Sequence, residues 1–204
     1  MLVYASSFVH SQVVISNDLY TVIYSEALQQ PLVLSYEVKK PRMIGFLSTD
    51  KLLNDMTGGR FFYVSTSITD QPCIYNLRDF ITSDAEDYKD NDYDKGHLAP
   101  YETFKDKGLD CVLNSYLNLA LMNSSLNRGV WILLEEYERT LDHVFVTISL
   151  AFDKSQRVLG GATIPTGFTK ILRYYDDGEW VEEIFSFPND PSVLGKKIHE
   201  FKIN

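Results

Sequence analysis

The stretch NRGVWILLEEYERTL, residues 127–141, decides the fold because it is the only long helical pattern in the sequence. On a helical wheel of about 100° per residue, apolar side chains at helical spacing form one arc. The residues of this arc are Val130, Leu133, Leu134, Tyr137 and Leu141. We expect the arc to pack on a core. A second set recurs every four residues and predicts a polar face, made of Asn127, Trp131, Glu135 and Arg139.

Alternating strand patterns lie on both sides of this helix. Before it, the patterns cover QVVIS, LYTVIYS and PLVLSYEV within residues 12–40, and RFFYVSTSI and PCIYNLRDFI extend the predicted sheet. After it come VFVTISLAF, RVLGGATIP and GFTKILRYY, separated by Gly-Gly and Pro-Thr-Gly turns. Strands around one central helix predict an α+β fold with a mixed antiparallel sheet. The length of 204 residues favours a single domain over residues 1–204.

Composition restricts the classes of function. No run of about 18 apolar residues is present, so we expect no membrane-spanning helix. The first twenty residues lack a basic segment followed by a long apolar one, and we expect an intracellular protein. Cys73 and Cys111 lack the close spacing of zinc or redox sites, and we expect both to be reduced. The net charge of −9 argues against nucleic-acid binding, although a local basic region can coexist with acid elsewhere.

Asn127 stands where the predicted helix begins. Its side chain and the free N–H groups of a first turn would lie together at the positive end of the helix dipole, which favours phosphate. The alternative is an ordinary N-cap asparagine, followed by a solvated face with a Glu135–Arg139 pair. The helix alone does not separate these two interpretations.

A second motif, DYDKGHLAP at residues 92–100, contains the strongest candidate for proton transfer. The proton affinity of histidine suits general-base catalysis near neutral pH, so His97 is that candidate. Gly96 relieves steric crowding beside it. Asp94 either fixes the tautomer of the imidazole or supports the loop. A purely structural histidine is the competing interpretation.

Together, DYDKGHLAP and the segment NSYLNLALMNSSLNRGVWILLEEYER, residues 114–139, resemble the DNA/RNA non-specific endonucleases of the ββα-metal superfamily. The Asp-Arg-Gly-His signature of that family falls on Asp94, Lys95, Gly96 and His97. Its Asn-x-Gly-x-Trp-x-x-Leu-Glu helix falls on Asn127, Gly129, Trp131, Leu134 and Glu135, and Arg139 follows in place. The resemblance implies a ββα-metal motif at the centre of the fold.

The resemblance also implies a function, that of a metal-dependent endonuclease. Such an enzyme hydrolyses phosphodiester bonds of DNA, RNA or both without sequence preference, leaving 5′-phosphate and 3′-hydroxyl ends. Asn127 would bind one Mg²⁺, or Mn²⁺ in its place, and Glu135 would orient water around the metal. His97 would be the general base, while Arg139 and Lys95 would add positive potential at the transition state. A second copy of the chain and an inhibitor protein are the further partners that it suggests.

Three departures from the family pattern stand out. Lys95 replaces the usual arginine and loses the two parallel hydrogen bonds to phosphate. Leu121 and Met122 replace a Pro-Gln pair. An upstream phosphate-binding arginine has no clear equivalent, and Arg78 is the candidate, with Arg128 as a second substrate-binding residue.

Two other functions stay open at this point. A family member that has lost turnover would act as a binding or interaction protein, which the acidic composition favours. An unrelated hydrolase would pair His97 with a serine such as Ser115, but the GxSxG elbow of such enzymes is not in the sequence.

Overall fold

The computed structural model describes residues 12–39, 60–63, 81–158 and 160–203. Its largest element is an eight-stranded sheet in which neighbouring strands are antiparallel, except for the parallel pair β1 and β4. In spatial order the strands are β10 (Lys202–Ile203), β9 (Glu179–Pro188), β8 (Thr163–Asp176), β7 (His143–Arg157), β3 (Gln30–Lys39), β2 (Tyr20–Ser25), β1 (Gln12–Ser16) and β4 (Arg60–Tyr63). The predicted α+β class with a mixed sheet is confirmed.

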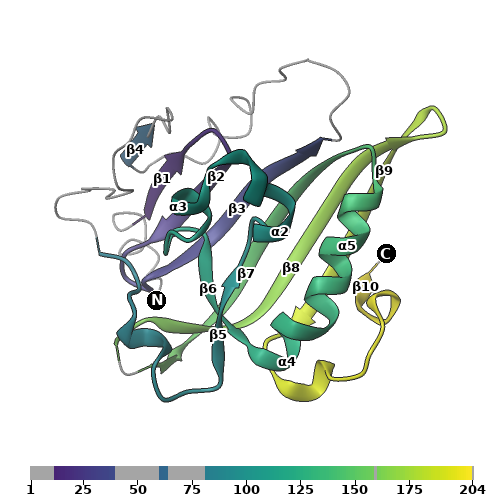
Figure 1. Cartoon of the computed structure of the whole chain (residues 1–204). Helices are drawn as coiled ribbons and strands as arrows, with labels where there is room; N and C mark the ends of the chain where they lie inside the picture. Colours follow the sequence, from purple (N-terminus) through teal and green to yellow (C-terminus); the bar gives the residue numbers. More distant parts are fainter. Residues whose placement is uncertain (1–11, 40–59, 64–80, 159, 204) are drawn as a thin grey trace, which may run out of the picture.

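A smaller two-stranded sheet leads directly into the long helix and forms the ββα unit (Figure 1). Strand β5 (Tyr93–His97) pairs antiparallel with β6 (Leu119–Asn123). The chain then passes through α4 (Ser124–Leu126), the π-helical turn η4 (Asn127–Trp131) and α5 (Ile132–Thr140). Between β5 and β6 lie α2 (Tyr101–Phe104), η3 (Lys105–Lys107) and α3 (Asp110–Leu113). The remaining short turns are η2 (Glu86–Tyr88), η5 (Pro191–Val193) and η6 (Ile198–Phe201).

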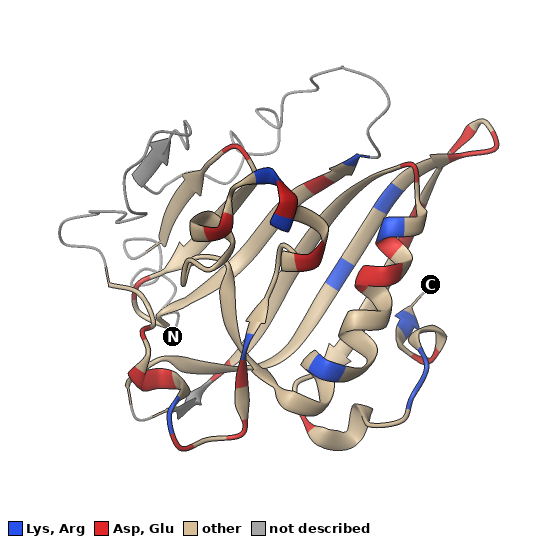
Figure 2. Ribbon diagram, in the orientation of Figure 1, with Lys and Arg blue, Asp and Glu red and all other residues tan. Residues whose placement is uncertain are grey.

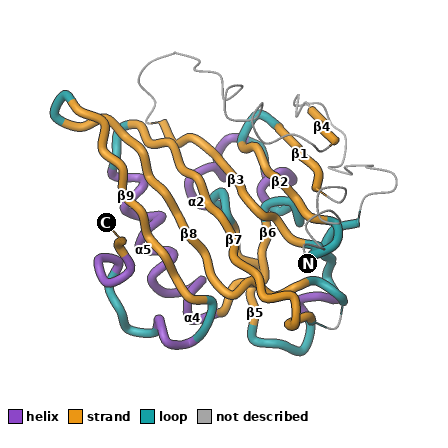
Figure 3. Tube along the Cα trace, turned by 180° about the vertical axis from the view of Figure 1, so that it is seen from behind, coloured by secondary structure: helices purple, strands orange, loops and turns teal. Residues whose placement is uncertain are grey.

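The described helices lie on one face of the large sheet. From behind, the strands lie in front of the helices (Figure 3). The helix packs through Trp131, whose ring meets Phe168 of β8 at 5.6 Å and Phe187 of β9 at 5.8 Å. This layer of side chains between helix and sheet is the core that fixes the position of the ββα unit.

Most of the predicted strands are present, with one correction in the late part of the chain. The three alternating segments before residue 40 form β1, β2 and β3 as expected. The predicted turn at Pro165–Thr166–Gly167 does not break the chain, because β8 continues through it with an irregular register against β7. Glycine explains this, since a Cβ at Gly167 would lie 2.7 Å from the carbonyl oxygen of Phe187. Residues 72–80 of the predicted strand PCIYNLRDFI lie outside the described residues.

The predicted start of the helix is wrong by three residues. The helical run begins at Ser124, and the N-cap is Asn123, whose Oδ1 accepts a hydrogen bond from Ser125 N at 3.0 Å. The Asn-Ser-Ser sequence is an ordinary helix start. Asn127 is therefore not a capping residue, and it lies at the π-helical turn inside the run.

The predicted apolar arc is also partly wrong. Val130 and Leu134 are buried, but Leu133 is 44% exposed. Trp131 and Glu135 of the predicted polar face are buried instead. The π-helical turn and Gly129, with φ −113° and ψ −116°, rotate the following residues relative to a regular helix. A face that appears polar in sequence is thereby turned toward the sheet.

The structure also bears on the predicted state of the cysteines and on membrane-spanning helices. Cys111 is disulfide-bonded, so the prediction that it is reduced is wrong, and its partner lies outside the described residues. The intracellular location, which rested on the first twenty residues, stays a prediction. Within the described ranges, no helix has the length and apolar character to cross a membrane.

Candidate active site

Side-chain hydrogen bonds from Asn127 and Trp131 connect strand β5 to the helical run. The side-chain amide of Asn127 donates from Nδ2 to Oδ2 of Asp94 at 3.0 Å. Four residues further along, Trp131 donates from Nε1 to the backbone oxygen of His97 at 3.2 Å. The strand that carries the candidate base is thus fixed against the turn that carries the candidate metal ligand.

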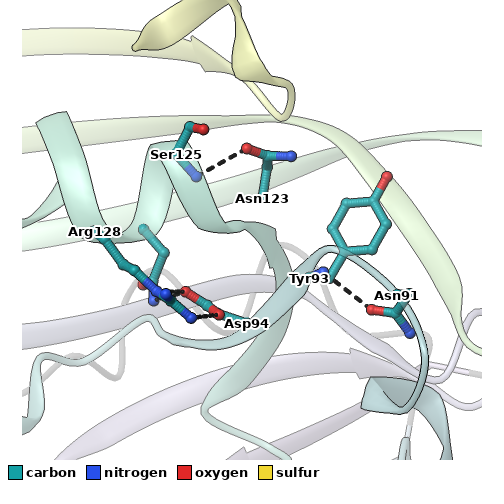
Figure 4. A network of polar contacts seen from close by, with 7 residues as sticks. Asn91, Tyr93, Asp94, Asn123, Ser125 and Arg128 are labelled. Atoms are coloured by element: carbon teal, nitrogen blue, oxygen red, sulfur yellow. Dashed lines mark hydrogen bonds and ion pairs between the residues drawn. The ribbon is translucent and has the colours of Figure 1, made fainter. Parts of the chain in front are cut away.

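Asp94 also binds Arg128 through both carboxylate oxygens (Figure 4). The guanidinium donates from Nε to Oδ2 at 2.8 Å and from Nη2 to Oδ1 at 2.6 Å. Burial acts to raise the pKa of Asp94, but the hydrogen bonds from Arg128 and Asn127 outweigh it and lower the pKa. Asp94 is therefore an anion that fixes Asn127 and does not contact the imidazole of His97.

This arrangement leaves one end of the Asn127 amide for a ligand. Because Nδ2 is engaged by Asp94, Oδ1 must point elsewhere. A neutral amide oxygen is a donor of the hard kind that Mg²⁺ prefers. The described residues contain no group of three or more histidine, cysteine or acidic side chains arranged to hold a metal. One amide oxygen with water as the other ligands suits Mg²⁺, an ion that keeps most of its waters.

His97 is oriented by Asn114, a residue that no sequence motif points to. The ring nitrogen Nε2 lies 3.1 Å from Oδ1 of Asn114, and Asn114 Nδ2 donates to the backbone oxygen of Asp110 at 2.9 Å. The second bond fixes the amide, so an acceptor faces the ring. Nε2 must then carry the proton, which leaves Nδ1 with a free lone pair.

The environment of His97 favours its neutral form. Burial lowers the pKa of the imidazole below its ordinary value, and the hydrogen bond that the ring donates to Asn114 only partly opposes this shift. Tyr101 packs on the ring, with centroids 5.8 Å apart. A neutral imidazole with one free nitrogen is the form that a general base requires.

Gly96 permits the close pairing of β5 and β6. A Cβ at this position would lie 2.5 Å from Cβ of Met122, a distance that real structures do not tolerate. Met122 and Leu121 are both fully buried. The residues that replace the Pro-Gln pair therefore fill the core behind β5.

Lys95 lies between two tyrosine rings. Its Nζ is 5.6 Å from the centroid of Tyr88 and 5.3 Å from that of Tyr116, and it donates to the Tyr116 hydroxyl at 3.3 Å. The lysine is exposed, as a phosphate-binding group must be. It lies on the same face of β5 as His97, because side chains two residues apart point the same way.

Glu135 and Arg139 follow on the next turns of the helix. Glu135 is 8% exposed, and burial raises its pKa to about 7, partly opposed by the nearby charge of Lys170. Arg139 donates from Nη1 to the Thr103 hydroxyl at 3.4 Å. That contact ties Arg139 to α2, the helix that follows His97.

The other predicted site residues are placed less favourably. Arg128 is occupied by Asp94, although 73% of its side chain is exposed. Arg78 lies outside the described residues. Ser115 accepts a hydrogen bond from Leu117 N, so this contact gives no support to a serine hydrolase.

Acidic residues gather at the β8–β9 hairpin and before β5, and Glu102 pairs with Lys105 near the site (Figure 2). The local excess of positive charge is small.

Comparison with known proteins identifies the family of this chain. The family model for DNA/RNA non-specific endonucleases matches residues 4–202, nearly the whole chain. The chain belongs to the DNA/RNA non-specific endonuclease family. Nucleic acid is the substrate that this membership implies. None of the curated proteins gave a significant match.

A solved structure shares the fold of this family member. It is a chain from the crystal structure of the EndoG/EndoGI complex, which was described as showing the mechanism of EndoG inhibition. The match has a TM-score of 0.67 at 17% identity and covers 94% of this chain and 80% of that chain. At this identity the likeness establishes the fold and carries no residue roles.

Proposed function

We propose that this family member is a Mg²⁺-dependent endonuclease that hydrolyses DNA, RNA or both without sequence preference. The observation that carries the proposal is the Asp94–Asn127 hydrogen bond, because it aims the amide oxygen of Asn127 away from Asp94. Contacts to phosphate carry no sequence information, which is why base preference is expected to be weak. The products are 5′-phosphate and 3′-hydroxyl ends.

His97 is the general base. Nδ1 takes a proton from the attacking water, the water oxygen forms a bond to phosphorus, and the bond from phosphorus to the 3′-oxygen breaks. The 3′-oxygen then takes a proton from solvent. Two features support this role: the hydrogen bond to Asn114 leaves Nδ1 free, and burial keeps the imidazole neutral.

The residues around Asn127 fit a single Mg²⁺, with Mn²⁺ as a substitute. Asn127 would hold the metal through Oδ1, and Glu135 would orient water near it. When bound, the metal stabilises negative charge on the phosphate and on the departing oxygen. Lys95 and Arg139 add positive charge to the same region, and Lys95 does so as a point charge without the bidentate geometry of arginine.

The direct test is to incubate purified protein with plasmid DNA and with RNA, in Mg²⁺ and in EDTA. Cleavage that EDTA abolishes and Mg²⁺ or Mn²⁺ restores is the expected result. Asn127→Ala should lose cleavage, and added Mg²⁺ should not restore it. If Asn127→Ala in saturating EDTA cuts as fast as wild type in Mg²⁺, the metal assignment is wrong. Binding of nucleic acid without any cleavage would instead support a family member that serves as a binding protein.

Partners other than nucleic acid stay predictions. The inhibitor in the structural relative's complex concerns that protein. We propose that an inhibitor and a second copy of the chain are the partners to look for. Size-exclusion chromatography with light scattering decides the second of these.

A further inference from the structure

A buried charged cluster lies beneath α5, outside the residues that the proposed reaction uses. Lys170 of β8 and Glu138 of α5 are both fully buried, and Tyr36 of β3 is 5% exposed. Lys170 Nζ lies 2.5 Å from Oε1 of Glu138, and the Tyr36 hydroxyl donates to Oε2 at 2.5 Å. Both carboxylate oxygens are therefore engaged, by groups from two different strands.

The same ammonium group also contacts Trp131, which lies seven residues before Glu138 in the helical run. Nζ of Lys170 lies 4.2 Å from the centroid of the Trp131 ring. That is a close cation–π contact in a place from which water is excluded. Trp131 in turn donates to the backbone oxygen of His97. A continuous path of contacts thus runs from Lys170 through Trp131 to the strand that carries the general base.

Glu135 lies on the helix between the two groups that Lys170 contacts. Positions 131, 135 and 138 differ by four and three residues, so their side chains lie in one stripe. Lys170 is the strongest favourable charge acting on Glu135. Together these contacts place the Lys170 ammonium group where it holds Trp131 and Glu138, the two residues on either side of Glu135 on this face of the helix.

Stability alone does not account for this cluster. Removing two charges from water is costly, and replacing a buried ion pair by apolar side chains of similar size is often neutral or stabilising. A well-packed apolar pair would hold the helix on the sheet equally well. A function that needs the charge at this position is the better explanation.

We propose that Lys170 is a positioning residue of the nuclease site, which acts through Glu138 and Trp131 to hold Glu135 and the backbone of His97 in place. The proposal rests on the proposed nuclease function. Lys170 does not touch the substrate, and its effect is on turnover rather than on substrate binding.

The test compares single and double substitutions in the full chain. Lys170→Met alone leaves Glu138 buried without its cation, so its melting temperature should fall. Lys170→Met with Glu138→Leu removes both charges and should recover most of the melting temperature. Plasmid cleavage by this double variant should stay about 10- to 100-fold below wild type in kcat, with KM unchanged, as when a supporting partner of an active site is lost.

A matched control uses the same strand. Arg173 of β8 is exposed and pairs with Glu182 at 3.4 Å, so Arg173→Met removes a cation three residues away from Lys170. Its kcat should equal that of wild type. A spectroscopic reading is also available: in a Trp180→Phe background only Trp131 emits among the tryptophans, and Lys170→Met should shift its emission.

The outcomes separate the two proposals. A double variant that folds and cuts with wild-type kcat overturns the positioning role and leaves the nuclease function intact. Absence of cleavage by wild type in Mg²⁺ overturns both. If the double variant does not fold, Tyr36→Phe decides, because it removes only one hydroxyl from the same carboxylate. A severalfold fall in its kcat supports the role, and an unchanged kcat overturns it.

Discussion

Asn127 Nδ2 donates to Asp94 Oδ2 at 3.0 Å, and this bond determines which end of the amide is left for a metal. The acidic residue of the Asp-Lys-Gly-His segment thus acts on Asn127, which lies 33 residues away in sequence, and not on its near neighbour His97. The bond joins the two sequence motifs, because one residue of the first orients one residue of the second.

Substitution of Asp94 should therefore weaken metal-dependent cleavage. Asp94→Ala frees the Asn127 amide to rotate, and loss of such an orienting partner typically lowers metal affinity or activity about 10- to 100-fold. The measurement is the Mg²⁺ dependence of plasmid cleavage. Arg128→Ala is the matched control, because it removes the ion pair and keeps the bond to Asn127. Equal losses in the two variants would show that the ion pair, and not the orientation of Asn127, is what matters.

Asn114 should set both the rate and the pH profile through His97. Activity requires neutral His97, so it falls as the pH drops through the pKa of the folded protein, which burial lowers below 6.5. Asn114→Ala removes a contact that raises this pKa, so the acid limb should move to lower pH and the plateau rate should fall. Asn114→Asp keeps an acceptor and adds negative charge, so its limb should move to higher pH. Shifts in the same direction would contradict the assignment.

Glu135 should destabilise the fold at alkaline pH. Its folded pKa of about 7 lies above the ordinary value of 4.5, so the folded protein binds this proton more tightly than the unfolded chain does. The free energy of unfolding then decreases as the pH rises from 4.5 through 7. Glu135→Gln removes this loss and should melt higher than wild type at pH ~8, by on the order of a few degrees, while both melt alike at pH ~4.5. Parallel melting curves across this range would rule out the raised pKa.

Lys95 should matter through its charge. Lys95→Arg keeps the charge and adds a bidentate group, so its cleavage rate should equal or exceed that of wild type. Lys95→Ala removes the cation from between Tyr88 and Tyr116 and should lower the rate. Initial rates on the same plasmid decide this, with melting temperatures measured in parallel. Identical rates for all three proteins would remove Lys95 from the site.

Local sequence patterns predict most of the secondary structure correctly. Burial alternates along much of β2 and β3, because one face of the sheet packs on the core, whereas Val13, Val14 and Ile15 of β1 are all buried. The family motifs predicted the ββα unit, which the structure contains, and the roles of the site residues stay predictions. Gly96 is predicted to relieve steric crowding beside His97, and in the structure the close contact at Gly96 comes from Met122.

The remaining features depend on tertiary contacts that no local pattern encodes. Asn114 reaches His97 because α3 folds back beside β5, 17 residues away in sequence. Lys170 is a charged residue in an otherwise alternating strand, and only the arrival of Glu138 from the helix explains its burial. The apolar arc was wrong because the π-helical turn at Asn127–Trp131 interrupts the helical period on which the helical wheel depends.

The central claim is that His97 is a general base and not a structural histidine, and one comparison tests it most directly. Wild type and His97→Ala are assayed for plasmid cleavage in Mg²⁺, with melting temperature and Mg²⁺ binding measured on the same samples. Loss of a general base lowers the rate by about 10²- to 10⁴-fold, so the variant should retain its fold and metal binding and lose nearly all cleavage. A variant that unfolds, or one that folds and cuts at the wild-type rate, would contradict the claim.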